Sequence, residues 1–336
     1  MNEIAISILR GINSVVGNYG WSIVVFTLFI RLLMLPFDYK SRVGMRKTAK
    51  IQPKVQALQA KYGKDQEKLN RKMSELYKEE KVSPLSGCLP MLISWPFIIW
   101  MWSAMRAVAD EQVVRMVIEL LKNNESMPVL ESWLWIRNVW MPDSPFSSAL
   151  PEFNSMRQVA SNVWQNLMTT DTIATLPEQF RTLTVESFSS ANLNATLQSI
   201  YDFLKTTPVY IEHGGELPGW NINFFIIQVS LMKEANGLFL LPIFSCVSQF
   251  LMTKMTGQQQ PTADASGQQA QSTMKMMNWF FPIFSLWICA QYNGAFALYW
   301  VTSNVIMMFT TLFINRYLDK KEEKEKDLVS VEGSVK

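Results

Sequence analysis

The chain has 336 residues, of which 49% are hydrophobic, and it contains 20 Phe, 20 Met and 12 Trp. Its mean hydropathy is only +0.06, so apolar segments must alternate with long polar ones. Three widely separated cysteines and a single histidine argue against a disulfide framework, a zinc site or a His-dependent catalytic site, and no cofactor is expected.

Residues 1–18 are predicted to form a short amphipathic helix that lies on the outer membrane surface. Apolar residues recur at helical spacing, and polar residues occupy the opposite face. An ordinary helix packed on protein would show the same periodicity, so that alternative stays open. No cleavable signal peptide is expected, because the first residues carry no basic stretch before an apolar core. The apolar positions are Ile4, Ile8, Leu9, Ile12, Val15 and Val16.

Span one, residues 19–37, is an apolar run with a single charge, Arg31. Nineteen such residues can cross a bilayer, but a guanidinium at membrane depth is costly and cannot lose its proton. Arg31 could snorkel to the inner surface or face a hydrated polar cavity. Helical side chains lean toward the helix N-terminus, which is expected outside, so Arg31 should lean toward the bilayer centre. This direction favours the cavity.

Residues 38–83 are predicted to form a cytoplasmic helical hairpin with one thin apolar seam. Gly63 supplies the turn, and Asp65 is placed to cap the second helix. The other faces are rich in Lys, which suits a position near anionic lipid headgroups. A solvated hairpin without a specific role is the alternative. The seam positions are Ile51, Val55, Leu58, Leu69, Met73, Leu76 and Tyr77.

Four more apolar spans follow, which predicts an all-α polytopic membrane protein with five transmembrane helices. Spans three and four are short for a bilayer of about 30 Å and imply local thinning of the membrane. The loop after span three is Gln-, Gly- and Ser-rich, which is typical of a flexible segment. The expected segments are span two at 84–107, an external segment at 108–237, span three at 238–252, a flexible cytoplasmic loop at 253–277, span four at 278–292, span five at 295–314 and a charged cytoplasmic tail at 315–336.

The distribution of charge along the chain predicts its orientation in the membrane. Residues 38–83 hold 13 Lys and Arg against 6 Asp and Glu, whereas residues 108–237 hold 7 against 14. Since Lys and Arg in short loops mark the cytoplasmic side, the hairpin is expected inside and the acidic segment outside. The N-terminus is then external and the C-terminus cytoplasmic.

A cavity around Arg31 needs further polar side chains from other spans. No Asp or Glu lies within the five expected spans, so Arg31 has no carboxylate partner there and water must reach it. On span three, Ser245 and Ser248 share one helical face with Gln249. The sequence therefore predicts a hydrophilic, positively charged groove open to the cytoplasm. Its candidate residues are Arg31, Thr27, Gln249, Asn278, Trp300, Ser303 and Asn304.

Several segments of the chain resemble the YidC/Oxa-type membrane protein insertases of bacteria. Their order and spacing, with five spans, make the resemblance specific over roughly residues 15–145 and 238–317. The segments are Asn18-Tyr-Gly-Trp-Ser-Ile23, Arg31-Leu-Leu-Met-Leu-Pro36, Lys61-Tyr-Gly-Lys64, Pro84-Leu-Ser-Gly-Cys-Leu-Pro90, Leu241-Pro-Ile243 and Asn293-Gly-Ala-Phe-Ala-Leu-Tyr-Trp-Val-Thr-Ser-Asn304.

The resemblance implies a function and a location. In that family, five helices form a hydrophilic groove that is closed outside and open to the cytoplasm and lipid. The family's groove arginine corresponds to Arg31, which would draw in the hydrophilic end of a nascent membrane protein without nucleotide hydrolysis. The resemblance implies a multi-pass protein of the bacterial cytoplasmic membrane that is not an enzyme. Nascent membrane proteins and lipids are the expected partners, the ribosome and the Sec translocon are candidates, and no DNA partner is expected.

The chain departs from the family pattern in two places. About ninety residues, 144–237, separate an aromatic segment at 133–143 from span three, where the family usually continues quickly. They are Ser-, Thr- and Asn-rich, with short helices expected at 152–168 and 191–205. A tolerated loop expansion is favoured over a docking element or lid. The tail has 6 basic and 6 acidic residues, which argues against ribosome binding through it.

Two other functions compete with the insertase. An anion or small-solute transporter could use Arg31 as its site, although the halves of the chain show no repeat of the kind that such proteins often carry. An intramembrane enzyme would need acid–base or metal-binding groups that the spans do not contain.

Overall fold

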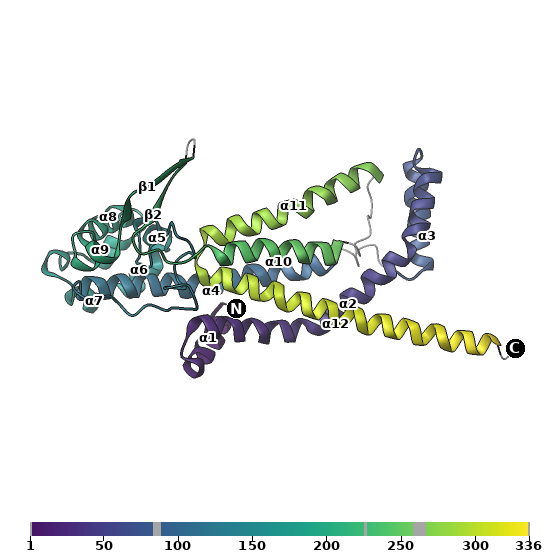
Figure 1. Ribbon diagram of the computed structural model, residues 1–336, viewed down its shortest axis with the longest axis horizontal. Helices are drawn as coiled ribbons and strands as arrows, with labels where there is room; N and C mark the ends of the chain where they lie inside the picture. Colours follow the sequence, from purple (N-terminus) through teal and green to yellow (C-terminus); the bar gives the residue numbers. More distant parts are fainter. Residues whose placement is uncertain (1, 83–88, 225–226, 258–266, 335–336) are drawn as a thin grey trace. The chain divides into compact units, whose positions relative to one another are not determined.

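The computed structural model describes residues 2–82, 89–224, 227–257 and 267–334 (Figure 1). It divides into two compact units. The first unit comprises Met1–Phe26, Trp100–Phe244 and Leu286–Trp300, and the second comprises Thr27–Ile99, Ser245–Ser285 and Val301–Lys336. The flexible loop expected at 253–277 and the start of span two extend over residues 258–266 and 84–88, which lie outside the described residues.

The described chain is mostly α-helical, as expected. Several helices are longer than the spans that they contain, and α11 begins eleven residues before the expected span four. The elements are α1 (Asn2–Val16), α2 (Tyr19–Tyr62), α3 (Gln66–Glu79), α4 (Leu89–Lys122), α5 (Phe153–Gln158), α6 (Ser161–Leu167), α7 (Thr170–Ala174), η2 (Glu178–Phe180), η3 (Val185–Phe188), α8 (Leu193–Leu204), α9 (Pro208–His213), β1 (Glu216–Phe224), β2 (Ile227–Met232), α10 (Leu240–Gly257), α11 (Gly267–Gln291) and α12 (Gly294–Ser334).

The expected all-α class needs one correction, because β1 and β2 form an antiparallel two-stranded sheet (Figure 1). Phe224 pairs with Ile227, and Asn221 pairs with Ser230. The sequence of β1 alternates apolar and polar residues from Asn221 to Phe224, which is the period of a strand. That alternation covers only four residues, which is too short to predict a strand from the sequence.

A hydrophobic core in the first unit holds the inserted segment together. The end of α4 contributes Val117 and Leu121, and the insertion contributes Trp164, Phe188 and Leu197, all of them fully buried or nearly so. Trp164 and Phe188 stack with ring centroids 5.9 Å apart. Large aromatic and aliphatic side chains buried in this way dominate the stability of a small domain. Residues 150–210 are therefore a folded structure built on α4.

Capping residues delimit the short helices of the insertion. Thr169 accepts a hydrogen bond from the backbone N–H of Thr172 at the start of α7, as an N-cap residue does. The single helix expected at 152–168 is instead two helices, α5 and α6, because Val159 between them has an extended backbone. The helix expected at 191–205 is present as α8.

Helix α1 packs one side on protein and leaves another exposed. Ala5 and Leu9 are buried, whereas Ile4 and Val15 are largely exposed. Arg10 forms an ion pair with Glu111 on α4, which fixes the helix within the first unit. The helix therefore packs on protein through one face, as the alternative expects, and its position on the membrane surface stays a prediction.

In the second unit, α2 continues without interruption from span one into the basic hairpin. The helix runs through Pro36 and Pro53, each of which removes one backbone donor. Asp65 accepts a hydrogen bond from the N–H of Lys68 at 3.0 Å and caps α3. The two helices bury a small apolar cluster against each other. Its residues are Ile51, Val55, Leu69, Met73, Leu76 and Tyr77, with Leu58 packed at its edge.

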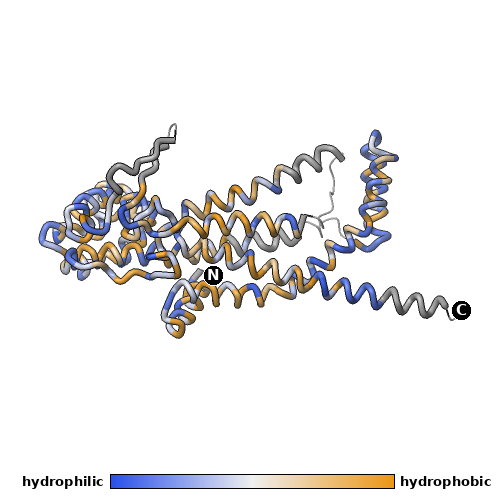
Figure 2. The backbone as a smooth tube through the Cα atoms, viewed as in Figure 1, coloured by the Kyte–Doolittle hydropathy of each residue, from blue (hydrophilic) through white to orange (hydrophobic). Residues whose placement is uncertain are grey.

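Two helices of the described chain are long and apolar enough to cross a membrane, Tyr19–Tyr62 and Gly294–Lys324. A third, Leu240–Met255, is apolar but shorter. Figure 2 shows that apolar residues dominate the first half of α2 and the first half of α12, and that polar residues dominate the second half of α2 and the coloured part of α12 that follows. The change from apolar to polar within one continuous helix is the pattern of a span that extends into water.

Candidate functional site

Arg31 contacts an uncharged side chain of span five. Its Nε donates a hydrogen bond to Oγ of Ser303 on α12 at 2.8 Å, and its Nη2 donates to the same oxygen. Arg31 is half-buried, and Ser303 is 3% exposed. A hydroxyl orients the guanidinium without neutralising it. The contact therefore fixes a positive charge in an apolar stretch of helix.

The residue after Ser303 extends the polar contacts to α10. Asn304 donates a hydrogen bond from Nδ2 to Oγ of Ser248 and to Oε1 of Gln249, at 3.2 Å in each case. Both Asn304 and Ser248 are buried. Since Ser303 and Asn304 are adjacent, the contacts with α2 and α10 meet at one turn of α12.

Three serines continue the polar contacts from α10 to α11. The hydroxyl of Ser248 donates to the carbonyl oxygen of Ser245 at 3.1 Å, and the hydroxyl of Ser245 donates to the carbonyl oxygen of Ser285 at 3.1 Å. The hydroxyl of Ser285 donates to that of Ser245 at 3.2 Å. Polar groups therefore connect four helices within the second unit. We call this set the polar seam; it comprises Arg31, Ser245, Ser248, Gln249, Ser285, Ser303 and Asn304.

The other candidate residues are placed differently. Thr27 is fully buried one helical turn before Arg31 on α2. Asn278 is exposed on α11, two turns before Ser285. Trp300 belongs to the first unit, where its ring contacts Phe296, and among the described residues its buried Nε1 has no acceptor. The seam thus unites Arg31, Gln249, Ser303 and Asn304 and leaves Asn278 and Trp300 outside it.

The hydroxyls of Ser245, Ser248 and Ser285 complete the seam, although they were not among the candidate residues. For Ser245 and Ser248 the signal was the spacing on α10, which places them on one face with Gln249, whereas Ser285 lies on α11. A second omission is Asp38, which lies just beyond span one and interacts electrostatically with Arg31 and Arg42. Its position seven residues after Arg31, two helical turns, could have revealed it.

Polar contacts between α2 and α12 continue past the expected spans. Arg42 is buried and donates to Oγ1 of Thr311 at 2.7 Å. Arg46 donates to the carbonyl oxygen of Asn315 at 2.9 Å and pairs with Asp319 at 2.7 Å. The contacts advance in the same direction along both helices, which therefore run parallel here.

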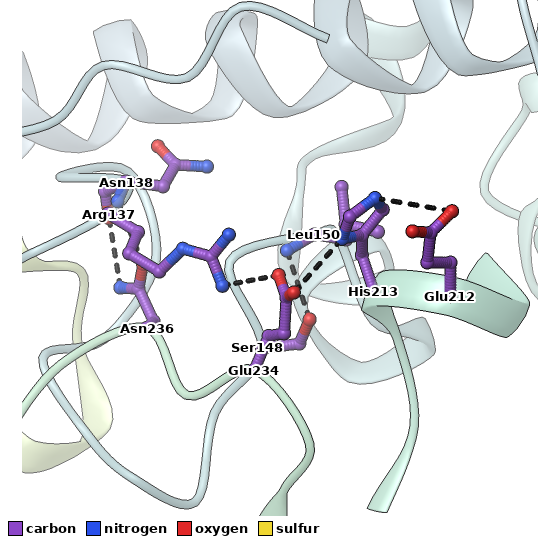
Figure 3. A network of polar contacts seen from close by, with 8 residues as sticks. All are labelled: Arg137, Asn138, Ser148, Leu150, Glu212, His213, Glu234 and Asn236. Carbon is purple, nitrogen blue, oxygen red and sulfur yellow. Dashed lines mark hydrogen bonds and ion pairs between the residues drawn. The ribbon is translucent and has the colours of Figure 1, made fainter. Parts of the chain in front are cut away.

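A second polar cluster lies in the first unit, where the insertion meets the aromatic segment (Figure 3). Glu234 forms an ion pair with Arg137, and its Oε1 lies 3.0 Å from Nδ1 of His213. Burial alone would raise the pKa of Glu234, but the hydrogen bonds with His213 and Arg137 outweigh it and hold the pKa below its usual value. The carboxylate thus interacts with two basic side chains, His213 through Oε1 and Arg137 through an ion pair at Oε2. This arrangement fastens the end of the insertion and has the character of a structural network.

Comparison with known proteins identifies the family. The model of the 60Kd inner membrane protein family matches residues 11–322. A protein of Caldanaerobacter subterraneus named "Membrane protein insertase YidC" is 50% identical over 93 residues, which cover 26% of this chain and 45% of that protein.

Proteins of Legionella pneumophila and Francisella tularensis subsp. novicida carry the same name. They are 43% and 45% identical over 113 and 112 residues, which cover 33% of this chain and 20% of each relative. The chain thus spans less than half the length of the relatives that it matches. Because the family match extends over nearly the whole chain, the resemblance read from its motifs is confirmed, and the chain belongs to the YidC/Oxa family, the 60Kd inner membrane protein family.

Proposed function

We propose that this chain is a membrane protein insertase and folding factor that works without nucleotide hydrolysis. The polar seam is the observation that carries the proposal. A fixed cation, held by hydroxyl and amide groups inside otherwise apolar helices, is expensive unless it has a task. Arginine at the centre of a membrane helix costs about 3 kcal/mol on insertion scales. Membership in a family whose relatives are named insertases supports the same function.

The seam suggests how a substrate would be handled. An acidic or polar end of a nascent chain would be drawn toward Arg31, since opposite charges attract more strongly where water is scarce. Amide and hydroxyl groups such as those of Gln249 and Ser303 would replace part of its hydration. The hydrophobic segment that follows would then leave sideways into lipid, because it gains by burial there.

We further propose the membrane arrangement. Five spans, made by α2, α4, α10, α11 and α12, would cross the bacterial cytoplasmic membrane with the N-terminus outside and the C-terminus in the cytoplasm. The excess of Lys and Arg in the hairpin supports this orientation. Nascent membrane proteins and lipids would be its partners, with the ribosome and the Sec translocon as further candidates. Asn278, Trp300 and Thr27 remain proposed groove residues beside the polar seam.

The experiment that tests the proposal is insertion of single-span substrates by the full chain in liposomes. Arg31→Ala should lower insertion of a substrate with an acidic translocated end by roughly tenfold, the equivalent of a charge-assisted hydrogen bond of about 1.5 kcal/mol. Arg31→Lys should be milder because it keeps the charge. Arg71→Ala removes an exposed arginine of the hairpin and is the matched control.

Insertion of every substrate at the wild-type rate by Arg31→Ala would refute the groove mechanism. Flux of small anions through the liposomes without any nascent chain, abolished by the same substitution, would instead favour a transporter.

A further inference from the structure

One face of α2 carries a line of charges that leads from the polar seam toward the hairpin. The positions seven and eleven residues after Arg31 are close to whole turns of an α-helix, and those at fifteen and nineteen continue in steps of four residues that move gradually around the helix. The residues that these side chains hydrogen-bond or pair with lie on α12, between Ser303 and Glu322. We call it the charged stripe; it comprises Arg31, Asp38, Arg42, Arg46 and Lys50.

Asp38 is the one acidic member of the stripe. It is half-buried and lies between two cations, about 10 Å along the helix axis from Arg31 and about 6 Å from Arg42 at 1.5 Å per residue. Burial raises the pKa of this carboxyl above its ordinary value, and both arginines act electrostatically in the opposite direction, favouring the charged form. Their hydrogen-bond acceptors on α12, Ser303 and Thr311, are uncharged hydroxyls. Asp38 therefore supplies negative charge that neither of those acceptors can provide.

This position has a consequence for any acidic segment that approaches Arg31 along the stripe. Such a segment carries the same sign of charge as Asp38 and competes with it for Arg31. Asp38 thus weakens the attraction that Arg31 exerts and shortens the time for which an acidic segment stays. A groove that must release its cargo needs a limit of this kind, because a charge bound too tightly would hold the substrate.

We propose that Asp38 is a specificity-determining residue: a resident counter-charge of Arg31 that limits how strongly and how long acidic substrate segments are held. The inference rests on the proposed insertase function. It predicts an effect on acidic segments and none on neutral ones, which a purely structural role for Asp38 would not produce.

The experiment uses the full chain in liposomes of phosphatidylethanolamine and phosphatidylglycerol. Two single-span substrates differ only in the translocated end, which carries two Asp in one and two Asn in the other. A photo-crosslinking side chain at Met307, one turn beyond Ser303 on α12, reports occupancy. Asp38→Asn should raise the crosslinking yield of the acidic substrate by about 3- to 10-fold, from the Coulomb energy of charges 6–10 Å apart at a protein surface. Its release in a chase should slow by a similar factor.

Two matched variants sharpen the result. Asp38→Glu keeps the charge and should behave like the wild type, and Glu67→Gln makes the same change of charge on an exposed position of α3 and should have no effect. The neutral substrate should crosslink equally in all variants. Equal changes for both substrates, or equal behaviour of Asp38→Asn and Glu67→Gln, would overturn the inference.

A further variant covers the case in which Asp38→Asn does not fold. Asp38→Asn/Arg42→Gln removes an anion and a nearby cation together. It should still favour the acidic substrate over the neutral one more than the wild type does, because Asp38 is closer to Arg31 than Arg42 is. An unchanged ratio would refute the role of Asp38. If Arg31→Ala impairs acidic substrates while both Asp38 variants match the wild type, the proposed function stands and only this inference fails.

Discussion

The side chain of Asn236 hydrogen-bonds both backbone groups of Asn138, a residue 98 positions earlier. Its Oδ1 accepts from the N–H of Asn138 at 2.8 Å, and its Nδ2 donates to the carbonyl oxygen of Asn138 at 2.9 Å. The same Nδ2 contacts the carbonyl oxygens of Met141 and Pro142. One buried amide therefore closes the base of the insertion onto the segment that precedes it.

Removal of this amide should destabilise the first unit. Asn236→Ala leaves buried backbone groups without a partner, at about 1–3 kcal/mol for each. We expect a lower melting temperature and faster proteolysis within residues 144–237. Asn192→Ala, which removes an exposed amide bonded to the carbonyl oxygen of Glu186, is the control and should change little. Equal protease resistance of the two variants would contradict this role of Asn236.

The side chain that caps α10 leaves no room for a Cβ at Gly237. Asp143 is fully buried and accepts hydrogen bonds from the N–H groups of Phe239 and Leu241 at 3.2 and 2.7 Å. A Cβ at Gly237 would overlap the carboxylate of Asp143. Gly237→Ala should therefore destabilise the protein by about 1–3 kcal/mol, as overpacking does.

The control for Gly237→Ala is a glycine with free space around it. A Cβ at Gly11, within α1, would meet nothing within 4 Å. Gly11→Ala should be neutral or slightly stabilising, by about 0.5–1 kcal/mol, since alanine is the better helix former. Thermal unfolding in detergent compares the two variants. The prediction for Gly237 is wrong if both substitutions raise the melting temperature.

Asp110, on α4 beyond the expected end of span two, should make the stability of the first unit depend on pH. Burial raises its pKa to about 6, although Arg106 and the N–H of Ala160 act in the opposite direction. Because the folded state holds this proton more tightly than the unfolded state, its contribution to stability is present below pH 3.8. It is lost as the pH rises to about 6.

Asp110→Asn removes the cost of burying the charge. It should raise the melting temperature at pH 8 and have less effect at pH 4. Asp202→Asn is the control, since Asp202 is exposed and paired with Lys205, and it should not raise the melting temperature at pH 8. A gain of equal size at both pH values for Asp110→Asn would show that charge burial is not the cause.

Arg46 should fasten the distal part of α12. Its side chain is 16% exposed and contacts the carbonyl oxygen of Asn315 as well as Asp319. Arg46→Ala should loosen this contact by about 1.5–3 kcal/mol, the range for hydrogen bonds to charged groups. Hydrogen exchange of residues 312–325 should become faster. Arg71→Ala, whose exposed side chain lies 4.0 Å from Glu75, should leave that exchange unchanged.

The sequence by itself predicted the features that depend on residues a few positions apart in the chain. The charge of Arg31 within an apolar run, the cap at Asp65 and the shared face of Ser245, Ser248 and Gln249 all follow from helical spacing. The motifs were enough to indicate the family. These features depend on residues a few positions apart, so their physics is readable without the fold.

The tertiary structure decided which distant groups meet. Ser303 orients Arg31 from 272 positions away, and Asn304 contacts Gln249 from 55 positions away. No periodicity contains such pairings, because they arise from the packing of separate helices. For the same reason, the sequence predicted a polar cavity around Arg31, whereas the structure shows a seam of hydrogen bonds across four helices and adds Asp38 as a nearby carboxylate.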